Sequence, residues 1–125
     1  MARKNAGKTF NLNDDGEILQ INSPMSRIEG NPYVVVLKDV NERWCIVALK
    51  WDNQHQLGIR WFWDNSGFPQ TNGIATWTVL PNNLSRIVLR GATGLSQTRI
   101  KFVEDFLDGR IDGITLKNEF NNKGV

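Results

Sequence analysis

The alternation of apolar and polar residues over the first 80 positions predicts β-strands. Four segments are rich in β-branched and aromatic side chains and are bounded by turn residues: 33–38, 43–51, 56–63 and 74–80. Upstream of them, the sequence Asp14-Asp15-Gly16 separates two short apolar segments. Because glycine accepts the positive φ of a tight turn, we expect a β-hairpin over residues 9–21. Together these segments predict a twisted antiparallel meander of about four to six strands.

After residue 80 the apolar spacing changes to the three- and four-residue period of amphipathic helices. A first helix is predicted within residues 81–91, although the run 84–90 also fits a strand. A second helix is predicted over residues 96–107, with Gly109 at the position of a left-handed C-terminal residue. Large apolar residues are sparse over residues 110–125, and we expect a short strand there, followed by a frayed tail.

Strands followed by helices are typical of the α+β class. We expect an antiparallel sheet with the two C-terminal helices packed on one face. A chain of 125 residues has about the length of one domain, so residues 1–125 are predicted to form a single domain with flexible ends at 1–8 and 121–125. The longest apolar runs are far shorter than the roughly 18 residues of a membrane span, and the basic start of the chain leads into no hydrophobic segment. These features predict a cytoplasmic protein that does not contact a membrane.

The positive charges are distributed unevenly along the chain. The formal net charge is +2, but residues 65–103 contain no Asp or Glu. This stretch carries four cations: Arg86, Arg90, Arg99 and Lys101. Such a stretch favours an anionic partner, although the same residues also fit the solvated face of a helix.

The five tryptophans all lie between residues 44 and 77, within the predicted strands and their loops. Because successive side chains of a strand point to opposite faces, each long strand can be divided into odd and even positions. We expect the odd positions to line the core beneath the helices, including four tryptophans: Trp51, Trp61, Trp63 and Trp77. The opposite face would then carry a mixture of aromatic, polar and basic side chains: Trp44, Ile46, Lys50, Arg60, Phe62, Thr76 and Thr78.

Aromatic and basic side chains on one open sheet face are typical of proteins that bind single-stranded nucleic acid. A base stacks on an aromatic ring while a nearby cation neutralises the phosphate. The predicted binding residues come from the strands, the loop 64–73 and the first helix: Trp44, Lys50, Arg60, Phe62, Phe68, Arg86 and Arg90. Arg99 and Lys101 would add further phosphate contacts.

Two other kinds of binding fit the same pattern. The second sheet face is apolar enough to be a protein interface, including one between two copies of the chain in a homodimer, or to be covered by the N-terminal hairpin. Alternatively, a pocket between sheet and helices would bind a small molecule.

The sequence contains few features that are typical of enzymes. The chain has no nucleophile elbow, phosphate loop or metalloprotease helix. Its single cysteine, Cys45, lies in an apolar strand, and its single histidine, His55, lies in a predicted turn, so we expect no disulfide and no zinc site. No motif is specific enough to indicate a family. The sequence therefore favours a non-enzymatic binding module without a cofactor or metal.

Overall fold

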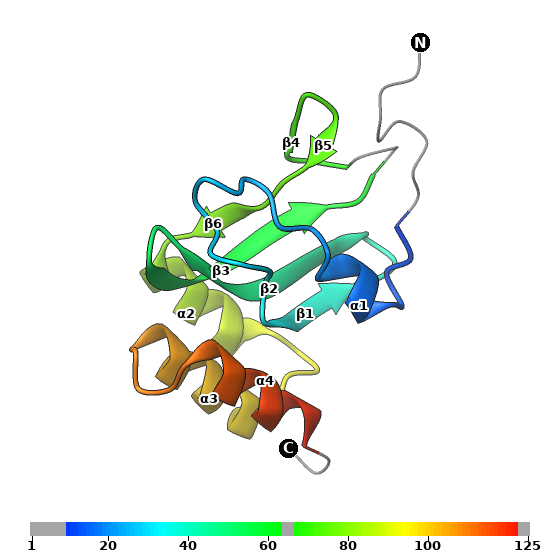
Figure 1. The fold of residues 1–125 in the computed structure, drawn as a ribbon. Coiled ribbons are helices and arrows are strands. Elements are labelled where there is room, and N and C mark those ends of the chain that lie inside the picture. Colours follow the sequence, from blue (N-terminus) through cyan, green and yellow to red (C-terminus); the bar gives the residue numbers. More distant parts are fainter. Residues whose placement is uncertain (1–9, 64–66, 123–125) are drawn as a thin grey trace.

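The computed structural model describes residues 10–63 and 67–122, and it has the α+β architecture predicted from the sequence (Figure 1). Within these residues, an antiparallel sheet has the strand order β1-β2-β3-β6. Its strands are β1 (Val34–Asp39), β2 (Trp44–Trp51), β3 (Gln54–Trp61) and β6 (Thr78–Leu80). A small hairpin is formed by β4 (Gln70–Thr71) and β5 (Ile74–Ala75). The helices are α1 (Asp15–Ile18), α2 (Asn82–Gly91), α3 (Gln97–Leu107) and α4 (Gly113–Asn121).

The turn between β2 and β3 determines which residues share a face of the sheet. Asp52 and Asn53 have φ values of 49° and 65°, which is the conformation of a two-residue hairpin turn and one that Asp and Asn tolerate. This turn pairs Lys50 with His55 and Trp44 with Trp61. Even-numbered residues of β2 therefore lie on the same face as odd-numbered residues of β3.

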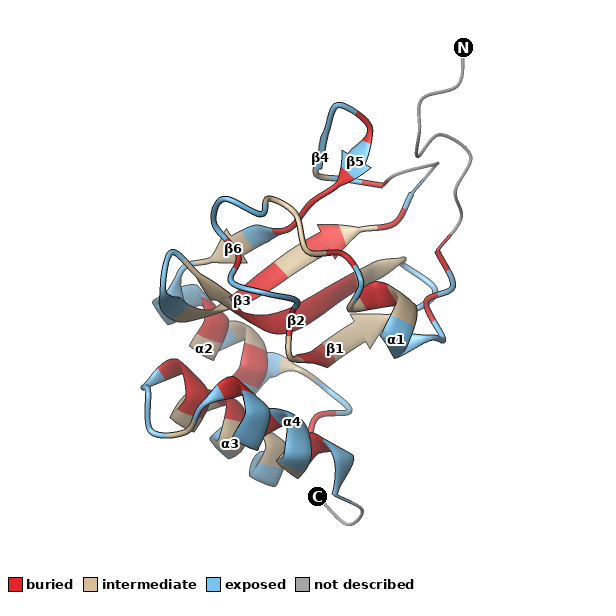
Figure 2. Ribbon diagram, viewed as in Figure 1, coloured by how far each residue is buried: buried red, intermediate tan, exposed pale blue. Residues whose placement is uncertain are grey.

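One face of the sheet is covered by α2, α3 and α4, which we call the helical layer. Their buried side chains pack on the strands: Ile46, Ala48 and Leu57 from the sheet, and Leu89, Val103, Phe106, Leu116 and Phe120 from the helices. Figure 2 shows buried residues along β2 and β3 and exposed residues on the outer sides of α3 and α4. The odd positions of the strands were predicted to line this face, and Leu57 and Ile59 of β3 do so. Trp51 and Trp77 were predicted here too, but they pack on the opposite face of the sheet.

The other face is covered by residues 10–28, which we call the N-terminal layer, and by Trp77. The side chains buried here come from distant parts of the chain: Phe10, Leu12, Ile18, Ile21, Ile28, Val35, Cys45, Val47, Leu49, Phe62, Ala75 and Trp77. Two side-chain hydrogen bonds are among the long-range contacts that anchor the layer. The indole Nε1 of Trp77 donates to the carbonyl of Ile21 at 2.8 Å, and Lys38 Nζ donates to the carbonyl of Leu12 at 2.5 Å.

The predicted N-terminal hairpin is wrong. Within the described part of residues 9–21, the chain forms the short helix α1 instead. Asp14 is its N-cap, and the Asp14 carboxylate accepts a hydrogen bond from the backbone N–H of Glu17 at 3.2 Å. An N-capping aspartate followed by acidic residues stabilises the first turn of a helix, so Asp14-Asp15-Gly16 starts a helix rather than closing a hairpin.

The C-terminal prediction also needs correction, because the expected strand is helix α4. Asp112 caps this helix by accepting a hydrogen bond from the N–H of Thr115 at 2.8 Å. Leu116 and Phe120, four residues apart, bury the same side of the helix in the core. These two apolar residues at helical spacing are sufficient to stabilise the helix, because they pack on an existing hydrophobic core.

The remaining elements agree with the prediction in kind. The run 84–90 belongs to α2, and α3 begins after Ser96, whose Oγ accepts a hydrogen bond from the N–H of Arg99 at 3.1 Å. The predicted strand 74–80 is divided into β5 and β6. Of the predicted flexible ends, residues 1–8 and 123–125 lie outside the described residues, whereas Asn121, predicted to be in the flexible end, is the last residue of α4. Across the described ranges, no helix combines the length and the apolar character needed to cross a membrane.

Candidate functional site

The structure does not bring the predicted aromatic and basic residues together on one sheet face. Trp44 and Lys50 lie on the face covered by the helical layer, whereas Arg60 and Phe62 lie on the other. The prediction assigned the odd positions of neighbouring strands to the same face. A hairpin loop with an even number of residues pairs odd positions with even ones, so the length of the loop after Trp51 was the signal that would have placed them correctly.

Arg60 and Phe62 are core residues rather than parts of an open surface. Their exposed fractions are 0% and 1%. The ring of Phe62 meets that of Phe10 edge to face, with centroids 5.4 Å apart, and the Arg60 guanidinium lies 4.9 Å from the Phe62 centroid. Neither side chain is accessible to a nucleotide base in this structure.

The buried guanidinium of Arg60 holds neighbouring backbone in place. Its Nη1 donates to the carbonyls of Pro69 at 3.0 Å and Thr76 at 2.6 Å. Burial lowers the pKa of Arg60 to about 10, which still leaves the group charged at neutral pH. Gly67, with φ +69°, lies against it, and a Cβ there would overlap both the guanidinium and the carbonyl of Trp61. Arg60 is therefore structural.

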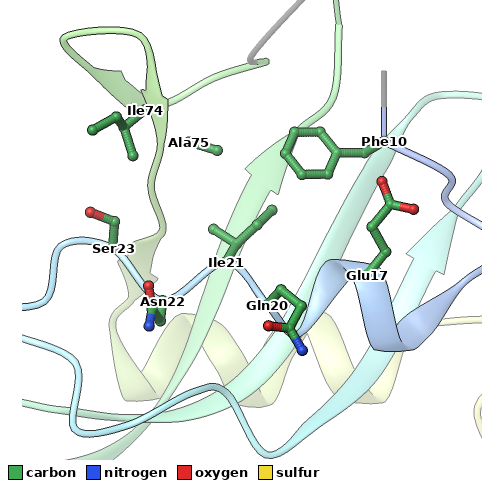
Figure 3. A pocket seen from close by; sticks show the side chains of 8 residues that line it. All are labelled: Phe10, Glu17, Gln20, Ile21, Asn22, Ser23, Ile74 and Ala75. Carbon is green, nitrogen blue, oxygen red and sulfur yellow. The ribbon is translucent and has the colours of Figure 1, made fainter. Parts of the chain in front are cut away.

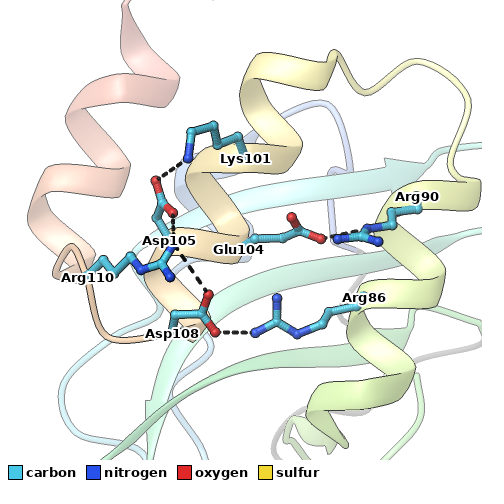
Figure 4. A network of polar contacts seen from close by, with 7 residues as sticks. All are labelled: Arg86, Arg90, Lys101, Glu104, Asp105, Asp108 and Arg110. Atoms are coloured by element: carbon cyan, nitrogen blue, oxygen red, sulfur yellow. Dashed lines mark hydrogen bonds and ion pairs between the residues drawn. The ribbon is translucent and has the colours of Figure 1, made fainter.

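Three of the cations predicted to contact phosphate, Arg86, Arg90 and Lys101, lie in a network of ion pairs between α2, α3 and the turn after α3 (Figure 4). The network contains Arg86, Arg90, Lys101, Glu104, Asp105, Asp108 and Arg110. Arg90 Nε donates a hydrogen bond to the Glu104 carboxylate at 2.9 Å, and this bond raises the pKa of the Arg90 guanidinium. Arg86 forms an ion pair with Asp108. The basic stretch is thus balanced by carboxylates that follow it in sequence.

The other two predicted cations have partners of their own. Lys50 Nζ lies 3.2 Å from a carboxylate oxygen of Glu29. Arg99 lies over the ring of Phe120, 4.6 Å from its centroid, and donates to the Phe120 carbonyl at 3.0 Å. Exposed ion pairs are weak and exchangeable, but they reduce the local positive potential that an anionic ligand would meet.

A group of exposed aromatic rings lies at the end of β3, and we call Trp61, Trp63 and Phe68 the aromatic patch. The exposed fractions of Trp63 and Phe68 are 50% and 59%, and Trp61 is partly buried. The rings of Trp61 and Trp63 have centroids 5.5 Å apart. Trp61 and Phe68 also exchange two backbone hydrogen bonds, of 2.7 and 2.9 Å. Phe68 is exposed as predicted, but Trp61 and Trp63 were wrongly assigned to the core.

The surroundings of the aromatic patch hold its rings in place and carry both signs of charge. Trp44 is paired with Trp61 across the sheet and packs partly on the helical layer. The indole N–H of Trp63 donates to the carbonyl of Glu42 at 3.3 Å. Arg43, next to Glu42, donates from Nε to the carbonyl of Phe62 at 2.9 Å. The end of β3 lies away from α3 and α4 in Figure 1.

The single cysteine and the single histidine are both held in structural contacts. Cys45 is fully buried, and burial raises the pKa of its thiol, which keeps it protonated. His55 stacks on Phe106 with centroids 4.2 Å apart, and its Nδ1 lies 2.7 Å from the Phe106 carbonyl. Because a carbonyl can only accept, Nδ1 carries a proton. Over residues 10–63 and 67–122, no group of three or more His, Cys, Asp or Glu side chains is arranged to hold a metal ion.

Comparisons with protein-family models, with curated proteins and with solved structures gave no match to this chain.

Proposed function

We propose that this chain is a non-enzymatic protein-interaction module whose aromatic patch binds a short apolar segment of another protein. The observation that carries the proposal is the exposure of two large rings, Trp63 at 50% and Phe68 at 59%, beside the partly buried Trp61. Aromatic side chains are enriched at protein interfaces and contribute much of the binding energy there. Burial of rings of this size against an apolar partner removes much apolar surface from water, and this stabilises the contact.

The size of the patch suits a short segment better than a second copy of the chain. A large aromatic side chain buries roughly 150–250 Å² in full, so the exposed parts of these three rings amount to about 300 Å². A stable dimer of standard size buries about 800 Å² on each partner. A peptide segment laid across the patch needs far less area, and we expect the contact to be weak and reversible.

The charges around the patch favour a protein over single-stranded nucleic acid, which remains the alternative. Nucleic-acid affinity depends on cations that neutralise phosphates. Beside the patch, Arg43 is adjacent in sequence to Glu42, and the cations of the basic stretch are engaged in the network of Figure 4. A rim that carries Glu42 as well as Arg43 suits an apolar peptide segment better than a polyanion.

The fixed positions of the rings also support binding. The Trp63 indole is held by its hydrogen bond to the Glu42 carbonyl and lies beside the Trp61 ring, with centroids 5.5 Å apart. Side chains that are already ordered lose less conformational entropy when a partner arrives.

The test is an array of short synthetic peptides of varied apolar content, probed with the wild-type chain and with the double variant Trp63→Ser/Phe68→Ser. The matched control is Ile114→Ser on α4, because Ile114 has an exposed fraction of 59%. We expect peptides that bind the wild type and the control but bind the patch variant at least about tenfold more weakly, a difference of about 1.4 kcal/mol.

Three outcomes would overturn the proposal. The first is that no peptide distinguishes the patch variant from the control. The second is that a thymidine oligonucleotide binds in a salt-dependent and Trp63-dependent manner while the peptides do not, which would assign the patch to nucleic acid. The third is a dimer in sedimentation that the patch variant alone dissociates, which would assign it to a second copy.

A further inference from the structure

A pocket of about 160 Å³ lies between the N-terminal layer and β5, separate from the aromatic patch residues (Figure 3). Its apolar side is formed by Phe10, Ile21 and Ala75, which are themselves buried, and by Ile74, which is exposed. Figure 3 shows these side chains and that of Glu17 around the same space. The apolar side is suited to a short hydrocarbon chain, which leaves water on entering it.

The polar side of the pocket carries one charge. Among the described residues that line it, Glu17 is the only ionisable one, and it is partly buried. Its Oε1 accepts a hydrogen bond from the backbone N–H of Asn11 at 3.3 Å. Two carboxylate oxygens have about four acceptor positions, so Glu17 retains capacity to accept from a ligand. Gln20 and Asn22 add amide groups beside it.

We propose that this pocket binds a primary ammonium group on a short aliphatic chain, the chemistry shared by n-alkylamines and the lysine side chain. The ammonium donates to the Glu17 carboxylate, and charge-assisted hydrogen bonds of this kind are stronger than neutral ones. The methylene groups lie along Phe10 and Ile21. An anionic ligand of the same length is repelled by Glu17.

The volume agrees with this ligand. An apolar cavity of about 150 Å³ accommodates benzene, with its six carbon atoms. The n-butylammonium ion, which is also the end of the lysine side chain, has about five non-hydrogen atoms, so it fits a pocket of about 160 Å³.

The position of the pocket connects it to the anchoring of the N-terminal layer. Ile21 accepts the indole hydrogen bond of Trp77 through its carbonyl, and the Ser23 carbonyl accepts from the backbone N–H of Trp77 at 2.8 Å. A ligand that holds Ile21 against Ala75 therefore also stabilises these contacts, and binding should raise the free energy of unfolding by mass action.

The experiment is a titration of the folded chain followed by the amide NMR signals of Ile21, Ser23 and Ala75. The probes are n-butylamine and Nα-acetyl-lysine methylamide, with butyrate as the anionic control of equal length. We expect saturable shifts with a Kd of about 1–10 mM for n-butylamine. Glu17→Gln is expected to weaken binding about tenfold, whereas Glu119→Gln, which alters a partly buried glutamate on α4, leaves it unchanged.

The two ammonium probes distinguish the natural source of the ligand. Equal or tighter binding of the lysine derivative indicates a lysine side chain of another protein, and binding of n-butylamine alone indicates a small free amine. Two results on the wild-type chain alone would overturn the proposal. One is that the amide shifts do not saturate with n-butylamine, and the other is that butyrate causes equal shifts. An unchanged affinity in a folded Glu17→Gln chain would overturn it as well.

Discussion

The two sides of the sheet are covered in different ways. The helical layer is built from α2, α3 and α4, whose hydrogen bonds are local and whose apolar residues recur every three or four positions. The N-terminal layer contains a single described helix, α1 of four residues, and the rest of residues 10–28 has no regular structure. Its contacts come from distant positions, such as the hydrogen bond from Trp77 to Ile21, 56 residues away.

This difference shows that burial does not require regular structure. Both layers exclude water from the strands, with Leu57 fully buried on one side and Val47 on the other. On the N-terminal side, a few long-range anchors replace the repeated local hydrogen bonds of helices. We therefore expect stability on that side to depend on single residues, and stability on the helical side to be distributed over caps and periodic contacts.

The largest expected effect is the loss of the Trp77 anchor. Trp77 has an exposed fraction of 2%, and Trp77→Ala should cost about 3–5 kcal/mol because it leaves a large cavity and an unsatisfied Ile21 carbonyl. The matched variant Trp63→Ala should cost only about 1–2 kcal/mol, because half of this side chain is already in water. Urea denaturation followed by circular dichroism measures both, and equal losses would contradict the assignment of these two tryptophans.

A smaller loss of stability is expected when the buried arginine, Arg60, or the surface arginine, Arg86, is replaced by methionine. Arg60→Met removes the donor to two carbonyls, those of Pro69 and Thr76, and should cost about 3 kcal/mol. Arg86→Met breaks an ion pair at the surface and should cost at most about 1 kcal/mol. Chemical denaturation of the two variants tests this order, and the reverse order would show that the helical layer depends on its ion pairs.

The smallest expected effect concerns a local cap of the helical layer. The pKa of Asp112 is lowered from 3.8 because its carboxylate accepts the backbone N–H of Thr115. Its contribution to stability is therefore complete above the ordinary pKa and is lost as the pH falls through the lowered pKa of the folded state. Asp112→Asn keeps an oxygen for the cap but does not titrate. Between about pH 5 and pH 2, thermal unfolding should show a larger loss in the wild type than in this variant, and parallel profiles would refute the role of the carboxylate.

Much of the fold was predictable because the strong elements have clear periodicity. The strands β2 and β3 and the helices α2 and α3 lie within about two residues of the predicted ranges. The N-terminal segment was not predictable from Asp14-Asp15-Gly16, which fits a hairpin turn and a helix cap equally well. The helix α4 was missed because Leu116 and Phe120 give it few apolar residues, and its stability comes from packing that the pattern alone does not reveal.

The candidate site was harder to predict than the fold. Phe68 was expected to be exposed because it lies in a loop between glycine and proline, and the structure agrees. Trp61 and Trp63 continue the odd positions of β3, but neither belongs to the two buried clusters. Alternation along a strand tells which residues share a face, but it does not tell where the elements that cover that face end.

Gly67 has a consequence for how this sequence can change in evolution. Its φ of +69° and its contacts with the Trp61 carbonyl and the Arg60 guanidinium leave no room for a side chain, whereas Gly109, with φ +77°, has open space around it. Position 67 should therefore remain glycine whatever residue stands at 60, because replacing Arg60 removes only one of the overlaps and leaves those with the backbone of Trp61 and Phe62. Drift at 109 meets only the cost of its backbone conformation.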